Sequence, residues 1–405
     1  MKPTLTLLAL ASSTALLGDS CCSPCEPCCV PQPRPPVCCE CYVPSYDDMQ
    51  CDWDLFLTVD FLYWYADETD LSYSAVAQTI SRSAVTTPAT ATTASSYKHL
   101  GSKWDPGVRV GLGWRMDGGW DLYANWTYYR NHKKNSTSVT SFNTQFPALG
   151  ASGIINPWID TSLMNLYTTL FNEVSAKWTM VFNQVDLELG RRYWLSKCFT
   201  LRPYTGLRGA WTHTTFKVNG EADQLMTTAA MTGVPMNDYL IDTSDQFRNR
   251  NWGVGMIGGL QPTFYFTDEF SLYGNAEVAV LWGQFNNRIK RHYTSTSTTA
   301  AGVASADINA TPSSRDNFSG IQPVVDVGIG LRWETCWCDD RYRFNLDAGW
   351  EHHVFLDYNY RVKLHDVDIE PTALAGTAGR ASSSYSEEHN NLGMGGFILR
   401  ARFDF

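Results

Sequence analysis

The chain has 405 residues, 13% of them aromatic, with a mean hydropathy of −0.25 and a net charge of −10 at pH 7. The acidic balance and the lack of a basic patch argue against a nucleic-acid partner. No apolar run reaches the ~18 residues of a membrane-spanning helix. A transmembrane β-barrel is compatible with such low hydropathy, because every second residue of its strands faces a polar interior.

Residues 1–20 have the features of a secretory signal peptide. Lys2 gives a positive start, residues 5–17 form an apolar stretch, and small residues lead to an expected cleavage after Ser20. Cys21 also permits a lipoprotein interpretation, which the acidic residue two positions earlier disfavours. In either case the mature chain is exported into an oxidising compartment.

Residues 21–52 form a Cys/Pro-rich arm, which we expect on the periplasmic side. Nine of the 12 cysteines lie here among seven prolines, a composition that supports neither a long helix nor a long strand. Cys25-x2-Cys28 and Cys38-x2-Cys41 have zinc-ligand spacing, but the oxidising compartment and the crowded cysteine doublets favour disulfides, so no metal site is expected. The disulfide candidates of the arm are Cys21, Cys22, Cys25, Cys28, Cys29, Cys38, Cys39, Cys41 and Cys51.

From residue 53 onward, alternating strands are joined by connections that are long, then short, then long again. In the first strand Leu55, Leu57 and Val59 lie on one face, and Thr58 and Asp60 on the other, which is the period of a half-buried strand. Short turns are predicted at 117–119, 196–197, 267–269 and 339–340. Long loops are predicted at 67–100, 133–176, 218–248 and 291–318, with a fifth before the last strand. The predicted strands are 53–65, 103–115, 120–131, 177–194, 198–216, 250–266, 270–289, 320–337, 341–363 and 397–405.

This plan predicts an all-β fold, an antiparallel transmembrane β-barrel of about ten strands (eight to twelve), formed by residues 53–405 with long outer loops and short periplasmic turns. The last strand, 397–405, alternates apolar and charged residues and ends on an aromatic residue, as expected of a strand that closes onto the first. A further hairpin inside 133–176 would give twelve strands. A soluble β-sandwich is the alternative, but it needs no such regular alternation of connections.

The three remaining cysteines test this topology. Cys198 opens the strand after one short turn, and Cys336 and Cys338 flank another. All twelve cysteines are therefore expected at the periplasmic rim, and these three are disulfide candidates as well.

Residues 157–172 have helical rather than strand periodicity. Asn156 suits a helix N-cap and Pro157 the first helical position, and Ile159 and Leu163 follow at helical spacing. We expect a short helix in the second long loop. It either folds into the pore mouth as a constriction or packs on the surface against other loops.

Charged residues on the non-lipid face of the strands are expected to line the barrel interior. Such charges must pair or stay hydrated. Two interpretations stay open: a polar conduit with a transverse field, and a salt-bridged plug in a barrel intermediate between filled eight-stranded and open sixteen-stranded ones. The pore-lining candidates are Asp60, Arg109, Arg115, Asp121, Asp186, Glu188, Arg192, Arg202, Arg208, Glu277, Asp326, Arg332, Asp347, Glu351, Arg400 and Arg402.

No arrangement typical of an enzyme is apparent. Glu351, His352 and His353 are adjacent, but neighbours on a strand face opposite sides, so at most one histidine enters the lumen. No Ser-His-Asp spacing, phosphate-binding loop or HExxH motif occurs. We expect neither catalysis nor a cofactor.

The stretches Trp53-Asp-Leu-Phe-Leu-Thr-Val-Asp-Phe-Leu-Tyr-Trp64, Leu187-Glu-Leu-Gly-Arg-Arg-Tyr193 and Phe344-Asn-Leu-Asp-Ala-Gly-Trp-Glu351 resemble the major-outer-membrane-protein-like porins of Legionella and the chlamydia-like bacteria. The resemblance covers residues 53–405. It implies a pore-forming or structural protein of the bacterial outer membrane, and its chlamydial side implies disulfide cross-linking of the envelope.

We therefore expect a porin-like channel for small polar solutes that is also disulfide-linked into the envelope. The alternative is a structural or adhesive protein with a plugged, non-conducting lumen. Expected partners are outer-membrane lipid, the barrel-assembly machinery through the strand ending at Phe405, and other Cys-rich envelope proteins or further copies of the chain.

Overall fold

The computed structural model describes residues 43–44, 54–69, 71–82, 89–116, 118–139, 152–158, 171–226, 237–299, 304–337, 342–369 and 381–405. The predicted signal peptide, the nine cysteines of the arm and Cys338 lie outside these ranges. Within them, no helix is long and apolar enough to cross a membrane.

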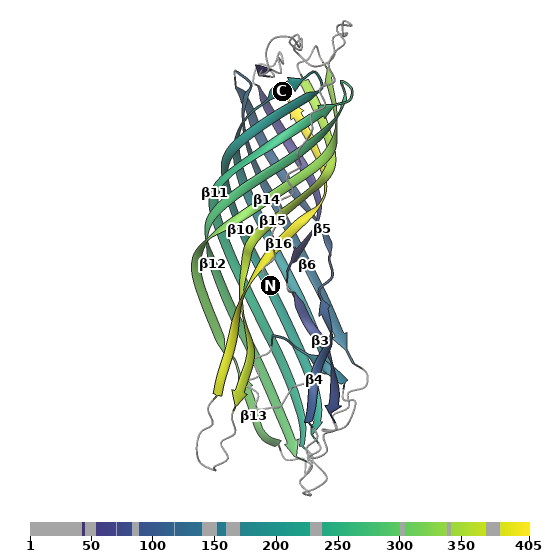
Figure 1. Cartoon of the computed structure of the whole chain (residues 1–405), viewed down its shortest axis with the longest axis vertical. Helices are drawn as coiled ribbons and strands as arrows, with labels where there is room; N and C mark the ends of the chain where they lie inside the picture. Colours follow the sequence, from purple (N-terminus) through teal and green to yellow (C-terminus); the bar gives the residue numbers. More distant parts are fainter. Residues whose placement is uncertain are drawn as a thin grey trace.

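Ten antiparallel strands of the described chain close into a tall barrel (Figure 1). In order around the barrel they are β2 (Leu55–Glu68), β5 (Trp104–Met116), β6 (Trp120–Ser138), β8 (Glu173–Arg191), β10 (Phe199–Met226), β11 (Asn237–Tyr265), β12 (Phe270–Thr299), β14 (Ser313–Trp337), β15 (Tyr342–Ile369) and β16 (Ala381–Asp404). The last strand pairs with the first, and the seam ends in reciprocal backbone hydrogen bonds of 2.9 and 3.1 Å between Leu55 and Phe405. The predicted ten-stranded barrel is confirmed.

Six short strands lie outside this ring. The strands β3 (Ser72–Arg82), β4 (Ala89–His99) and β7 (Ser152–Ile155) form a separate sheet in the order β4-β3-β7. The strand β13 (Ala304–Ala310) pairs with the outer part of β12, and at the opposite end of the barrel β1 (Val43–Pro44) pairs with β9 (Tyr193–Ser196). The alternative of a twelve-stranded barrel is wrong, because β7, within the second long loop, pairs with β3 and not with a barrel strand.

Side chains alternate between a lipid face and an interior face as predicted. On β2 the outward Leu57, Val59 and Phe61 are 45%, 47% and 50% exposed, whereas the inward Asp60 and Leu62 are fully buried. A soluble sheet would show the reverse arrangement, with the apolar face buried. Apolar side chains can face outward here because lipid surrounds the barrel.

The strands are longer than predicted. The described residues of predicted loop 218–248 all belong to β10 and β11, and most of predicted loop 291–318 belongs to β12, β13 and β14. The predicted bounds followed outward apolar residues, and that signal ends where a strand leaves the membrane. Beyond it the outward Asp242 and Ser244 are polar, while the inward Ile241 and Thr243 remain buried, so the period of two continues.

The predicted helix 157–172 is not helical at its described ends. Pro157 and Trp158 form a turn, and Phe171 makes an isolated antiparallel bridge with Ile154. Asn156 stabilises this turn, since its side-chain oxygen accepts the Trp158 backbone N–H at 3.0 Å. Residues 159–170 lie outside the described residues.

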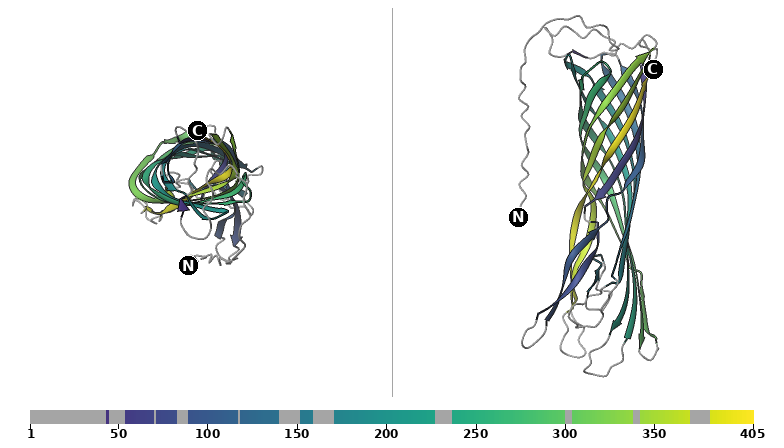
Figure 2. Two further views of the ribbon diagram at one scale, coloured as in Figure 1. Left: turned by 90° about the horizontal axis from the view of Figure 1, so that it is seen from above. Right: turned by 90° about the vertical axis from the view of Figure 1, so that its right-hand side faces the viewer.

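The short connections and the carboxyl terminus share one end of the barrel, and the long strand extensions lie at the other (Figure 2). The turn before β6 uses glycine where φ is positive, +83° at Gly118 and +76° at Gly119. Cys198 is exposed in the turn before β10, and Cys336 lies one residue from the end of β14. Both described cysteines therefore lie at this end, which we assign to the periplasm.

Candidate functional site

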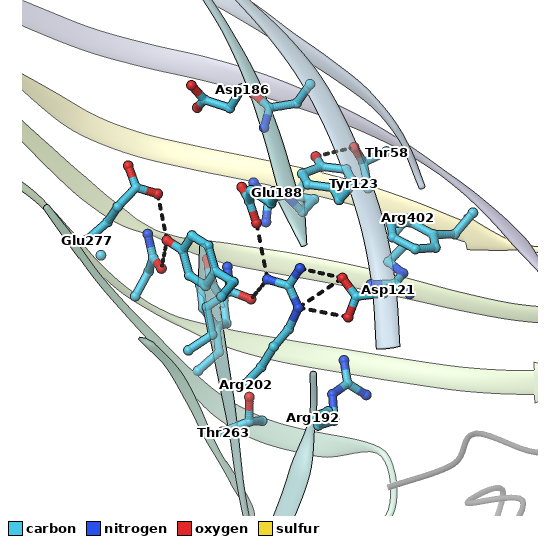
Figure 3. A pocket seen from close by; sticks show the side chains of 18 of the residues that line it. Thr58, Asp121, Tyr123, Asp186, Glu188, Arg192, Arg202, Thr263, Glu277 and Arg402 are labelled. Atoms are coloured by element: carbon cyan, nitrogen blue, oxygen red, sulfur yellow. Dashed lines mark hydrogen bonds and ion pairs between the residues drawn. The ribbon is translucent and has the colours of Figure 1, made fainter. Parts of the chain in front are cut away.

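The inward side chains of the periplasmic half surround a cavity of about 260 Å³, which we call the charged chamber (Figure 3). Of the sixteen predicted lining residues, all but two border it. Asp60 and Asp347 do not, because they are buried behind the arginines that bind them. The fourteen that do are Arg109, Arg115, Asp121, Asp186, Glu188, Arg192, Arg202, Arg208, Glu277, Asp326, Arg332, Glu351, Arg400 and Arg402.

Arg208 on β10 binds carboxylates from three other strands. Its Nε and Nη2 donate to Asp186 at 2.7 and 2.9 Å, and its Nη1 donates to Asp326 at 2.6 Å. It also forms an ion pair with Glu277. Asp326 lies on β14, three strands away around the ring, so this guanidinium bridges the lumen. His353 Nδ1 lies 2.8 Å from the other oxygen of Asp326.

A second network joins strands on both sides of the closing seam. Arg109 on β5 donates to Asp60 at 3.3 Å and makes two hydrogen bonds to Glu351 on β15, at 3.2 and 3.0 Å. Arg400 on β16 binds the two oxygens of Asp60 at 2.9 and 2.8 Å. Two-pronged pairs of this kind fix side-chain orientation as well as charge.

The other predicted arginines are held nearer the rim. Figure 3 shows Arg202 between Asp121, which it binds through two nitrogens, and Glu188, to which it donates at 3.1 Å. Arg332 makes two hydrogen bonds to Asp347, at 2.7 and 2.8 Å. Arg115 and Arg402 each lie 2.8 Å from Asp404, and Arg192 borders the cavity.

Farther out, the inward faces of β2, β6, β8, β15 and β16 carry apolar side chains. We call this the apolar layer, and each of its side chains is at most 2% exposed: Leu62, Trp64, Tyr129, Phe182, Phe355, Tyr358 and Met394. The rings of Phe182 on β8 and Phe355 on β15 meet edge to face, with centroids 5.6 Å apart. These two strands are five places apart in a ring of ten, so opposite walls of the barrel touch here.

Residues of the second long loop also occupy the interior of the barrel. Trp158 packs edge to face on the inward Phe216 and Phe247, at 5.4 and 5.0 Å between ring centroids, and its Nε1 donates to the Ser72 carbonyl at 2.7 Å. Phe171 occupies the space beside Gly220, where a Cβ would lie 2.7 Å from its ring. The two described ends of the loop, Trp158 and Phe171, therefore lie in the mouth of the barrel. Neither end is helical.

Several interior residues were missed at the sequence level. Tyr123, Tyr204 and Tyr273 line the chamber, and the Tyr204 hydroxyl donates to Glu277 at 2.6 Å. Their signal was present, since each falls on the same alternate positions as a charged neighbour, but only charged residues were selected. His353 faces inward and is 9% exposed, consistent with one histidine of the pair entering the lumen.

A closed antiparallel barrel with an apolar outer face and short turns at one end defines the class of outer-membrane β-barrel proteins. Residues 43–405 match the family described as Legionella pneumophila major outer membrane protein precursor, so the chain belongs to this family and is an outer-membrane protein. The predicted family and location are confirmed. No curated protein sequence matches the chain.

Solved structures of other outer-membrane barrels are similar only at a low level. The outer membrane protease OmpT of Escherichia coli has 9% identity and a TM-score of 0.33, over 88% of this chain and 98% of that one. A Pseudomonas aeruginosa FadL homologue and the Pseudomonas putida toluene transporter TodX each have 8% identity and a TM-score of 0.25, over 87% of this chain and 90% of theirs. These similarities carry no functional argument.

Proposed function

We propose that the protein is a structural and surface-exposed component of the outer membrane whose lumen is closed. The observation that carries this proposal is the contact of Phe182 with Phe355 across the barrel, within a layer of side chains that are at most 2% exposed. Trp158 and its loop add a second closure farther out. A solute would have to displace both.

The charge balance of the interior also supports a plug. The sixteen predicted lining residues comprise eight arginines and eight carboxylates. Arg208, Arg109 and Arg202 are each shared between carboxylates from different strands. Such pairing neutralises the field that would select a permeating ion, and it ties the walls together.

The long strands support a role at the cell surface. The strands β10, β11 and β12 continue well beyond their outward tryptophans, Trp211, Trp252 and Trp282. Their outward face there is polar, so this part of the barrel stands in water outside the membrane. We propose that it presents loops for contact with other surfaces.

A porin-like channel for small polar solutes is the second candidate. The charged chamber favours it, because its cavity of about 260 Å³ is lined by charged groups of both signs. Conduction would then require movement of the apolar layer and of the loop that holds Trp158.

Single-channel recording in planar bilayers distinguishes the two candidates. The refolded wild type should give no conductance steps. The triple variant Phe182→Ala/Phe355→Ala/Trp158→Ala, which removes both closures, should give steps, whereas the lipid-facing control Leu187→Ala/Val327→Ala should stay silent. Reproducible steps from the wild type would overturn the closed lumen and support the porin.

We also propose that the predicted arm links the barrel to other envelope components by disulfides. In support, Val43 pairs with Trp194 at the periplasmic rim, close to the exposed Cys198. This brings the end of the cysteine-rich segment to the same side of the membrane as the described cysteines.

A further inference from the structure

Basic residues dominate the outward face of the barrel just beyond its apolar band. Six of them form two rows across neighbouring strands, and we call them the outer basic belt: Lys134, Lys177, Lys217, Arg248, Arg288 and Arg315. Lys134, Lys177 and Lys217 are direct register partners on β6, β8 and β10. Arg248, Arg288 and Arg315 are direct register partners on β11, β12 and β14.

Each row places three like charges side by side. Directly opposed residues of antiparallel strands have Cβ atoms about 4.5–5.5 Å apart, and like charges at that distance are destabilising. In the part of the chain that the structure describes, none of the six forms an ion pair with a carboxylate. Arg250, on the membrane side of Arg248, adds a further charge next to the belt, and its Nε donates to His213 at 3.1 Å.

Acidic residues are absent from the two rows themselves. Glu173, Glu221 and Asp242 are register partners of one another, two outward positions beyond the lysine row on β8 and β10. At the β5 edge, Asp105 lies 3.4 Å from both Lys103 and His132. Basic and acidic residues therefore occupy separate rows of this surface. The basic rows do not reflect a general excess of lysine and arginine, because the chain has a net charge of −10.

The arginine row lies close to the outer membrane–water interface, and the lysine row lies farther out, since Lys217 pairs with Gln246, two residues beyond Arg248. On β11, Phe264 and Trp252 bound the outward apolar face, and Arg250 and Arg248 come next. Twelve residues of strand rise about 40 Å along the strand at ~3.3 Å per residue, or about 28 Å along the membrane normal at a tilt of ~45°. This is close to the ~25 Å apolar band and aromatic girdles of outer-membrane barrels.

We propose that the outer basic belt binds the phosphate groups of the phosphorylated glycolipid in the outer leaflet. A phosphate beside each row would relieve the repulsion between its three cations and accept charge-assisted hydrogen bonds from them. The apolar face on the membrane side of the belt would contact the acyl chains of the same molecule. Because the basic belt and the apolar face lie on the same strands, a lipid is favoured over a soluble polyanion, which would not contact the apolar face.

The site lies on the outside of the barrel, on β6 to β14, and is independent of whether the lumen conducts. It depends only on the placement of the protein in the outer membrane. Failure of the conductance test above would leave it unaffected, and its own failure would leave the closed lumen unaffected.

The test compares binding of three probes to the refolded full-length barrel in detergent: bis-phosphorylated lipid A, the same glycolipid after enzymatic removal of its phosphates, and phosphatidylglycerol. The wild type should bind the phosphorylated glycolipid about ten-fold or more tightly than the dephosphorylated one. Phosphatidylglycerol should bind more weakly than the phosphorylated glycolipid. Equal binding of the two glycolipids, or equal binding of phosphatidylglycerol, would overturn the proposal.

Variants assign the site. Lys134→Gln/Lys177→Gln/Lys217→Gln should lose about ten-fold or more of the affinity for the phosphorylated glycolipid. The control Lys98→Gln/Lys197→Gln removes two exposed lysines away from the belt and should keep it. Heat-modifiable migration in electrophoresis verifies that each variant is folded, and Lys177→Gln alone, in the middle of the row, replaces the triple variant if that does not fold. An equal loss in belt and control variants would refute the assignment.

Discussion

Replacing Arg208 by methionine should be among the most destabilising single changes in the barrel. Methionine keeps much of the side-chain length but leaves Asp186, Glu277 and Asp326 without their shared cation. Arg208 is 3% exposed at its side chain and these carboxylates 4–6%, so water cannot readily replace it. Removing one partner of a buried ion pair costs about 3–5 kcal/mol, and we expect a loss in this range.

Two further substitutions separate charge from geometry. Arg208→Lys keeps the cation but loses the two-pronged contact with Asp186 at 2.7 and 2.9 Å, so it should cost about 2 kcal/mol, the contribution of a charge-assisted hydrogen bond. Adding Glu277→Gln to Arg208→Met should recover part of the loss, because one unpaired charge is removed. The adjacent Leu207, 58% exposed to lipid, provides the control, and Leu207→Ala, which removes three carbons from the lipid face, should cost only about 2 kcal/mol.

The measurement is equilibrium unfolding by urea of the barrel refolded in lipid vesicles, followed by tryptophan fluorescence. Each variant is compared by its midpoint at constant slope, which isolates a change in stability from a change in exposed surface. If Arg208→Met proves no more costly than Leu207→Ala, or if Glu277→Gln recovers nothing, the carboxylates are hydrated and the interior is not held together by this arginine.

Three other outcomes test the arrangement. Leu187→Arg should lower stability by about 2–4 kcal/mol because it places a charge in lipid, whereas Gln184→Arg, on the inward face of the same strand, should be milder in the same unfolding assay; equal losses would mean that the faces are wrongly assigned. In intact cells, Ser244→Cys should react with a membrane-impermeant maleimide above the wild-type background and Lys197→Cys should not, and the opposite result would invert the topology. Non-reducing electrophoresis of envelopes should show high-mass species that reductant collapses and that deletion of residues 21–51 abolishes, while a monomer without reductant would contradict cross-linking through the arm.

The sequence was sufficient to predict the ring of strands because lipid leaves a strong pattern. Apolar residues at every second position, as on β2 and β14, are visible without any knowledge of their partners. The closure of the last strand, 397–405, onto the first was predicted too, since this strand has a complete lipid face and needs a partner. Interior charges such as Arg109 and Asp326 were found as the complement of that pattern.

The contact between Phe182 and Phe355 across the lumen could not be predicted in the same way. Phe182 and Phe355 are 173 positions apart in sequence. On both strands, the inward face carries charged residues closer to the periplasmic end. Nothing in the period of either strand indicates that their rings meet, because contact across a barrel depends on its diameter and shear. The length of the outer extensions was missed for a related reason, since outside the membrane neither face needs to be apolar.

The polar filling of the chamber has a rationale beyond stability. Replacing a buried ion pair by apolar residues is often neutral or stabilising in a folded protein, so the charged networks need not be the most stable way to fill this barrel. A strand that is apolar on both faces, however, would form a continuous apolar segment in the sequence. On β12 the inward Asn275 and Glu277 interrupt the outward Leu272, Val278 and Val280. Without such interruptions the segment would approach the ~18 apolar residues that define a membrane helix, and the exported chain would meet the inner membrane first. The charged residues pair and become buried only when the barrel closes. The chain therefore stays polar during export, and the same residues fill the interior of the folded barrel.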